Sequence, residues 1–171
     1  MTSQSCVAFS IPNSSASKVL TIAKENEGIR VSALSPQPPL RPKYEDYVFK
    51  FTTSEQLNSF LCASYAALGN EFLVQEIERS LTEQKFAQIY YRKMNAIIWH
   101  RLTMHVDPAM ITDVMEMINA TNAFRAEKHH ISTDYLVMAD FNSDVELNKF
   151  LRKAFQKFGK QFSVHLIYAI A

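Results

Sequence analysis

The sequence predicts an α+β fold made of two copies of one strand–helix–strand–strand–helix–strand unit. Three observations predict it: a gap-free repeat late in each half, matching helix boundaries inside both copies, and alternating apolar residues that are typical of strands. The chain has 171 residues, which is enough for one ordinary domain or for two small ones. Two small modules in tandem therefore fit the length.

The repeat aligns residues 51–74 with residues 141–164. Eight of the 24 aligned positions are identical: Phe51/Phe141, Leu57/Leu147, Asn58/Asn148, Phe60/Phe150, Leu61/Leu151, Gly69/Gly159, Phe72/Phe162 and Val74/Val164. A fixed internal period is the mark of a repeated architecture. We therefore expect the two halves to fold alike.

Each copy begins with a helix cap and ends with a glycine. Thr53 and Ser143 are each followed three residues later by Gln or Glu, the pattern of a capping box in which both side chains satisfy free backbone N–H groups. Apolar residues then recur every three or four positions, which predicts a helix with one buried face. Gly69 and Gly159 stand where a left-handed residue would end each helix.

Strands and shorter helices complete each unit. In the first half we expect strands at 6–11, 29–34 and 47–51, a helix at 15–27 and a further strand after Gly69. In the second half we expect strands within 96–106 and at 124–130, 135–141 and 162–170, and a helix at 107–120. Asp107 and Pro108 suit the cap and first position of that last helix. We expect Trp99 to pack in the core.

The resulting order is ferredoxin-like, so we predict antiparallel sheets with their helices on one face. We divide the chain into a first module at 1–80, a connector at 81–95 and a second module at 96–171. The two modules should pair within one chain into an eight-stranded sheet, because an uncovered sheet edge is a liability. The segments 29–34 and 124–130 are the expected meeting edges, with the helices at 15–27 and 107–120 side by side.

Composition excludes several classes of partner. Eighteen Lys and Arg residues face 17 Asp and Glu residues, a formal net charge of +1, which argues against a purely electrostatic binder of nucleic acid or of an anionic membrane. No apolar run reaches the length of a membrane span, and the N-terminus does not read as a secretory signal. Two cysteines favour a reducing compartment, so we expect a cytoplasmic protein.

Residue patterns give no sign of catalysis. The five histidines are His100, His105, His129, His130 and His165. None has the spacing of a known zinc or iron site, and no activated nucleophile or phosphate-binding glycine loop is visible. We therefore expect a non-enzymatic protein with no metal and no cofactor.

Residues 106–114 read VDPAMITDV. This run resembles the D-x-P-G-x-L-x-x-V signature of ACT domains, with one residue fewer and with Ala109 in place of the glycine. ACT domains are small ferredoxin-like modules that bind amino acids and regulate metabolic enzymes. Residues 16–51 are similar to the ACT domain of aromatic amino acid hydroxylases and prephenate dehydratases. The matching positions there are Lys18-Val19-Leu20, Glu25-Asn26, Pro38 and Tyr47-Val48-Phe49.

The resemblance implies a ligand site at the start of the first helix of one half, facing the second strand of a neighbouring half. Free N–H groups at a helix start attract a carboxylate. The residues so implied are Ser14, Ser15 and Ala16 or Asp107, Pro108 and Ala109, with Leu34 and Ser35 or His129 and His130 opposite. Ser14 and Ala109 replace the family's glycine, and a side chain there crowds the ligand.

Three functions stay open. The first is a regulatory module that binds an amino acid and acts through oligomerisation, as a homo-oligomer or with a protein partner. The second is an assembly subunit that has lost its ligand. The third is RNA binding through the sheet. Residues 44–51 have the aromatic side chains that such binding uses, but two acidic residues and the lack of a glycine argue against it.

Overall fold

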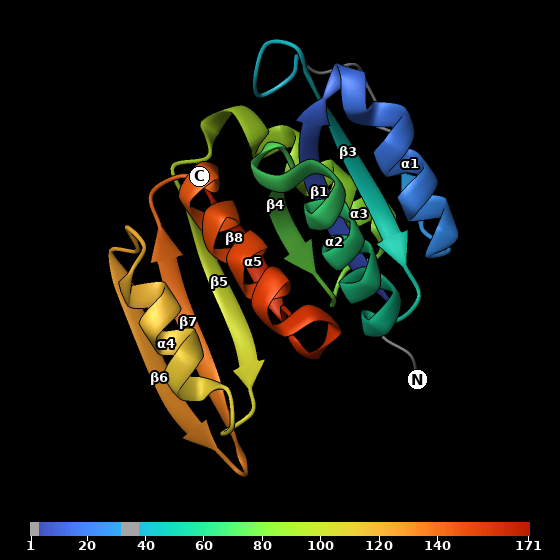
Figure 1. Ribbon diagram of the computed structural model, residues 1–171. Coiled ribbons are helices and arrows are strands. Elements are labelled where there is room, and N and C mark those ends of the chain that lie inside the picture. Colours follow the sequence, from blue (N-terminus) through green and yellow to red (C-terminus); the bar gives the residue numbers. More distant parts are fainter. Residues whose placement is uncertain (1–3, 32–37) are drawn as a thin grey trace.

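Across the described residues, one antiparallel sheet of eight strands forms the centre of the molecule (Figure 1). The structure is a computed structural model, and it describes residues 4–31 and 38–171. The strands are β1 (Ser5–Pro12), β2 (Ile29–Val31), β3 (Tyr44–Phe51), β4 (Leu73–Glu78), β5 (Trp99–Val106), β6 (Arg125–Ile131), β7 (Asp134–Phe141) and β8 (Leu166–Ile170). Their order across the sheet is β2-β3-β1-β4-β8-β5-β7-β6.

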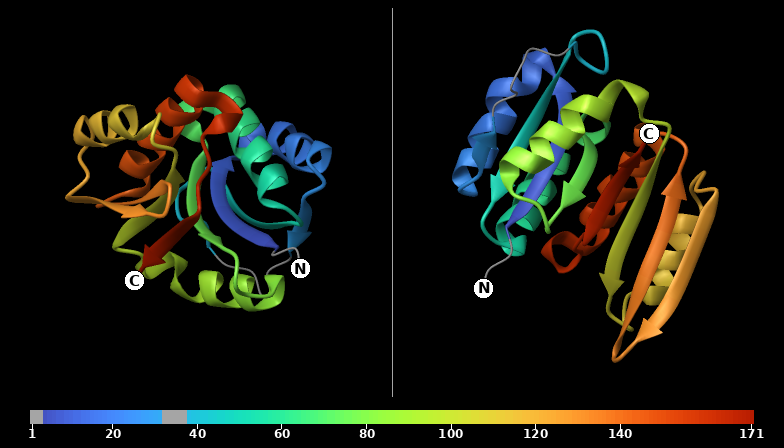
Figure 2. Two further views of the ribbon diagram at one scale, coloured as in Figure 1. Left: turned by 90° about the horizontal axis from the view of Figure 1, so that it is seen from below. Right: turned by 180° about the vertical axis from the view of Figure 1, so that it is seen from behind.

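Helices cover both faces of this sheet unequally (Figure 2). They are α1 (Ala16–Glu25), α2 (Ser54–Leu68), α3 (Glu83–Lys93), α4 (Ile111–Asn119) and α5 (Asp144–Phe158), with short 3-10 turns η1 (Asn13–Ser15), η2 (Gly69–Glu71), η3 (Met94–Ala96) and η4 (Gly159–Gln161). α1, α2, α4 and α5 share one face, whereas α3 lies on the opposite face over β1 and β3. None of the helices in the described ranges is long and apolar enough to cross a bilayer.

Both halves have ferredoxin-like topology. The order β2-β3-β1-β4 in the first half matches β6-β7-β5-β8 in the second. The register repeats as well, because Phe51 pairs with Ser5 and Phe141 pairs with His100. The predicted α+β class with two tandem ferredoxin-like modules is confirmed.

The two halves meet through their fourth strands, β4 and β8, in the middle of the sheet. The expectation that 29–34 and 124–130 would meet is wrong, since β2 and β6 form the two outer edges. The helices that lie side by side are α2 and α5, not α1 and α4. Burial explains the choice: almost all of β4 is buried and almost all of β6 is exposed, and a strand buried on both faces belongs in a sheet centre.

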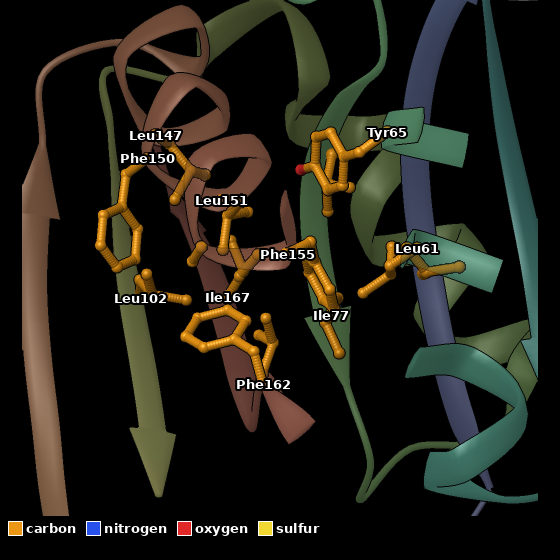
Figure 3. Packing of buried hydrophobic residues seen from close by; sticks show 14 of the residues in the cluster. Leu61, Tyr65, Ile77, Leu102, Leu147, Phe150, Leu151, Phe155, Phe162 and Ile167 are labelled. Carbon is orange, nitrogen blue, oxygen red and sulfur yellow. The ribbon is translucent and has the colours of Figure 1, made fainter. Parts of the chain in front are cut away.

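One hydrophobic core runs through both halves between the sheet and four of the helices. Figure 3 shows its middle, where side chains of α2 and α5 meet over the two central strands. The rings of Tyr65 and Phe155, which occupy equivalent places in the repeat, stack with centroids 5.7 Å apart. A smaller core lies under α3, where Phe86 and Tyr90 pack against Cys6 and Ala8 of β1.

The local signals predicted from the repeat are present, except that the capping box is complete only in the first copy. The hydroxyl of Thr53 accepts a hydrogen bond from the amide of Gln56, whose side chain returns the contact, and Ser143 caps α5 through its hydroxyl. Gly69 and Gly159 have φ values of +60° and +59°, which glycine adopts without strain. The repeat thus fixes both ends of α2 and α5.

Two local expectations are wrong. The helix predicted to start at Asp107 begins at Ile111, because the Asp107 carboxylate accepts from the amide of Ala109 at 2.8 Å and closes a separate turn. Trp99 does not enter either core: it is partly exposed on the sheet face without α4 and α5, and the neighbouring Ile98 is 69% exposed.

Candidate functional site

The two halves meet along β4 and β8, and we call this boundary the seam. The described parts of these strands share one register pair, Ile77 with Ile167, so side chains make many of the hydrogen bonds across the seam. Asn148 of α5 accepts from the Val74 amide at 2.8 Å and donates to the Val74 carbonyl at 3.0 Å. Asn58, the equivalent residue of α2, donates to a carbonyl of the other half at 2.6 Å. Side-chain amides therefore replace ladder hydrogen bonds where the two strands diverge.

Arg79, directly after β4, ties the halves at one end of the seam. Its Nε donates to the carbonyl of His165 at 2.8 Å and its Nη2 to the carbonyl of Val164 at 2.9 Å. Its Nη1 contacts the hydroxyl of Ser54 at the start of α2. Burial lowers the pKa of Arg79, and the two carbonyls stabilise its charge.

A pocket of about 410 Å³ opens elsewhere along the seam, and both halves line it. We call it the seam pocket; its lining residues are Leu40, Arg41, Gln75, Met94, Asn95, Ile97, Ile98, His100, Asn142, Ser143 and Asp144. Its volume lies in the usual range of small-molecule sites, roughly 300–1,000 Å³. The lining combines apolar side chains with one cation and one carboxylate.

A chain of hydrogen bonds runs along the wall of the seam pocket. Arg41 binds Asp144 through both terminal nitrogens, with Nη1 2.6 Å from Oδ2, which is the strong bidentate geometry. Gln75 donates its Nε2 to Asp144 Oδ2 at 2.6 Å, and its Oε1 lies 3.1 Å from Nε2 of His100. Since the amide nitrogen of Gln75 serves Asp144, its oxygen accepts, and Nε2 of His100 carries the hydrogen.

Burial and hydrogen bonding together set the charges of the residues in this hydrogen-bonded row. Burial alone would raise the pKa of Asp144, but the hydrogen bonds from Arg41 and Gln75 outweigh it and the pKa is lowered. Burial lowers the pKa of His100 to about 4. At neutral pH the pocket therefore holds an ionised carboxylate, a guanidinium and a neutral imidazole.

One polar atom in the wall has no partner. Nδ1 of His100 is buried and makes no hydrogen bond within the described part of the chain. In the tautomer fixed by Gln75 it is an acceptor, and a buried acceptor without a donor is costly. Such groups are rare in folded proteins, and functional sites are one place where they persist.

The first-half residues of the site predicted from the ACT resemblance lie at the start of α1. Ser14 and Ser15 belong to η1, and Ala16 is the first residue of α1. The Ser15 side chain makes no capping hydrogen bond. Leu34 and Ser35 lie outside the described residues.

The second-half residues of that site are Asp107, Pro108, Ala109, His129 and His130. The structure brings Asp107 and His130 to one end of the sheet, because Val106 and His130 both pair with Tyr135. His129 and His130 project to opposite faces: the ring of His130 lies 4.9 Å from that of Tyr135 on the helix side, and His129 contacts Glu127. Only His130 can therefore face the start of α4.

Among the described residues of the predicted site, Ser14, Ser15 and Ala16 at the start of α1 do not face His129 and His130 of β6 within one chain. β6 forms one outer edge of the sheet and the described β2 forms the other, so the start of α1 does not meet β6 in the same chain. A site of that kind would need a second chain.

Arg41, Gln75 and Asp144 were not among the predicted site residues. Arg41 and Asp144 are 103 positions apart, so no local motif joins them. The repeat does not single them out either. Ser54 stands opposite Asp144, but 16 of the 24 aligned positions differ between the two copies.

No protein-family model and no curated protein matches the chain. Among solved structures, a proposed glycine cleavage system transcriptional repressor is similar over 99% of each chain, at 8% identity and a TM-score of 0.34. A microcompartment protein from Desulfitobacterium hafniense DCB matches at 11% identity over 98% of this chain and 94% of that chain, with a TM-score of 0.34. A protein of unknown function from Galdieria sulphuraria matches at 11% identity over 99% of each chain, with a TM-score of 0.33. Similarity this low carries no inference about ligand or activity.

Proposed function

We propose that this chain is a non-enzymatic regulatory module of the ACT-like kind, which binds a small ligand, an amino acid, and acts through its association state. The observation that carries the proposal is the seam pocket, to which both halves contribute charged or buried polar groups. We place the ligand there.

The chemistry of the seam pocket suits a small zwitterion. The guanidinium of Arg41 has five N–H donors and uses two terminal nitrogens on Asp144, so donors remain for a ligand carboxylate. The Asp144 carboxylate can accept from a ligand ammonium group. Leu40, Ile97 and Ile98 supply apolar surface for a side chain.

The position of the pocket suits regulation. Arg41 and Gln75 come from the first half, and His100 and Asp144 come from the second. A ligand that contacts both sets stabilises the arrangement of the halves to which it binds best. Binding would then change the surfaces that the halves present to a partner.

Thermal unfolding with each of the twenty L-amino acids at millimolar concentration tests the proposal. A ligand at one hundred times its dissociation constant adds about 2.7 kcal/mol of stability. For a chain of this length that corresponds to a rise in Tm of roughly 5–10 °C. We expect one amino acid, or a chemically related few, to give such a rise.

Two variants locate the site. Arg41→Gln should abolish the rise in Tm, because Arg41 lines the pocket and is partly exposed. Arg79→Gln is the matched control, since it removes a guanidinium that bridges the seam outside the pocket, and it should keep the rise. A flat response to all twenty amino acids would overturn the proposal in favour of the ligand-free assembly subunit.

A further inference from the structure

In the part of the chain that the structure describes, no helix covers one face of the second half of the sheet. α3 covers that side of the first half, whereas α4 and α5 both lie on the other side (Figure 2). Leu102 and Val137 point into the main core, so their strand neighbours Arg101 and Met138 project outward on the bare side. We call this surface the open face and define it by Trp99, Arg101, Arg125, Met138, Asp140 and Tyr168.

Aromatic and cationic side chains lie together on the open face. The rings of Trp99 and Phe124 meet edge to face at 5.6 Å, and the guanidinium of Arg101 lies 5.2 Å from the Trp99 ring. Phe124 is 46% exposed. Large aromatic residues with arginine are enriched in protein interfaces.

The side chains of the open face do not leave room for a helix to pack as α3 does on the first half. In the first half, Cys6 and Val48 are buried beneath α3. The register places Arg101 where the first half has Cys6, and Met138 where it has Val48. Arg101 and Met138 are larger than Cys6 and Val48, so they occupy the space above the sheet that α3 occupies in the first half.

We propose that the open face is the surface through which two copies of this chain associate, sheet against sheet, about a twofold axis parallel to the strands. This goes beyond the proposed ligand site and holds whether or not the seam pocket is occupied.

Charge pairing on the open face carries the proposal. Tyr168, Arg101, Asp140 and Arg125 form one row across the four strands. Asp140 binds Arg101 at 2.9 Å and lies 3.8 Å from Arg125, so an interface there would not bury an isolated charge. A twofold axis along the strands reverses the row, which places the less tightly paired Arg125 over the Tyr168 ring of the second copy.

The shape of the surface fits the same partner. α3 projects from the sheet beside the open face by the thickness of one helix (Figure 2). Two stacked sheets lie about 10 Å apart, which is close to that thickness. The sheet of a second copy would therefore fit beside α3, with its β6 edge against that helix. The four strands project an area of about 19 by 23 Å, the size of a weak rather than an obligate interface, so we expect association at micromolar concentrations.

Single-stranded nucleic acid is the rival occupant, because bases stack on exposed aromatic rings. The charges argue against it. Both arginines of the open face lie beside Asp140, and Glu127 projects on the same side, opposite Met138. Phosphates need cations that are not already compensated.

Sedimentation equilibrium from about 1 to 200 µM tests the proposal. The wild-type chain should shift from 19.6 kDa to twice that mass. Met138→Lys, which puts a charge at the middle of the open face, should raise the dissociation constant at least tenfold. Val145→Lys is the matched control, because Val145 lies on α5 on the other side and is 38% exposed, and it should dimerise like the wild type.

Trp99 supplies an independent readout, since it is the only tryptophan. Its emission should change with concentration in the wild type and not in Met138→Lys. A wild type that stays monomeric at 200 µM, or a dimer that Met138→Lys leaves intact, would overturn the proposal. Quenching of Trp99 by a single-stranded oligonucleotide at physiological salt would overturn it in favour of nucleic-acid binding.

Discussion

Asn148 pairs with the backbone of Val74 as a neighbouring strand would. Its Oδ1 accepts from the Val74 amide at 2.8 Å and its Nδ2 donates to the Val74 carbonyl at 3.0 Å. Oδ1 also accepts from the hydroxyl of Tyr65, and Nδ2 also donates to the carbonyl of Asp144 at 2.7 Å. The Asn148 side chain of the second half thus satisfies backbone groups of β4 in the first half. It also contacts Asp144, which lines the seam pocket.

Asn148→Ala should lower the free energy of unfolding by about 2–4 kcal/mol, because it leaves several buried polar groups without a partner. Urea unfolding measures the loss. Asn58→Ala is the matched control at the equivalent place in the repeat, where the side chain is only partly buried, and it should cost about 1 kcal/mol. Equal costs for the two variants would contradict the role given to Asn148.

Burial of His100 makes stability depend on pH. Burial lowers its folded-state pKa from 6.5 to about 4; Asp144 opposes this shift, while Lys93 and Arg41 add to it. Between these two pKa values the unfolded chain binds a proton that the folded chain does not, so this contribution to stability falls as the pH falls. From pH 7 to pH 5 the contribution amounts to about 2 kcal/mol.

His100→Gln isolates that effect, because glutamine can keep a hydrogen bond to Gln75 and does not titrate. The free energies of unfolding from urea titrations at pH 7 and pH 5 should differ by about 2 kcal/mol less in the variant than in the wild type. An identical pH dependence in both proteins would show that His100 takes up its proton without cost in the folded state.

Gly28 is required for space. A Cβ at this position would lie 2.7 and 2.8 Å from two atoms of the Phe51 ring and 3.1 Å from the carbonyl of Ala23. Gly28→Ala should therefore destabilise the chain by about 1–3 kcal/mol. In a Phe51→Leu background the same substitution should cost less, because the smaller side chain relieves the clash. Additive costs in the double variant, measured by urea unfolding, would refute the contact with Phe51 as the cause.

The sequence predicts what depends on local chemistry. The capping residues Thr53 and Ser143, the terminal glycines and the gap-free repeat are enough to place α2 and α5 and to give the order of elements in both halves. These signals lie within a few residues of the structure that they specify. The predicted start of α4 failed for a local reason, since the carboxylate of Asp107 satisfies the amide of Ala109 before the helix begins.

The seam could not be predicted in this way. Which strand edges meet depends on long-range packing, and the residues that line the seam pocket come from separate parts of the chain. Arg41 lies 103 positions from Asp144, and Gln75 lies 69 positions from it. Trp99 shows the same limit: an aromatic residue on a strand usually packs inside, and only the placement of α3 on the first half leaves this one outside. The sequence alone does not state which half α3 covers.

Backbone amide chemical shifts during a titration test most directly whether a ligand binds in the seam pocket. The labelled chain would be titrated with an equimolar mixture of the twenty L-amino acids to millimolar concentration. We expect the largest chemical-shift changes at Arg41, Gln75, His100 and Asp144. Shifts confined to the helix starts at 14–16 and 107–109, or no shifts at all, would contradict it.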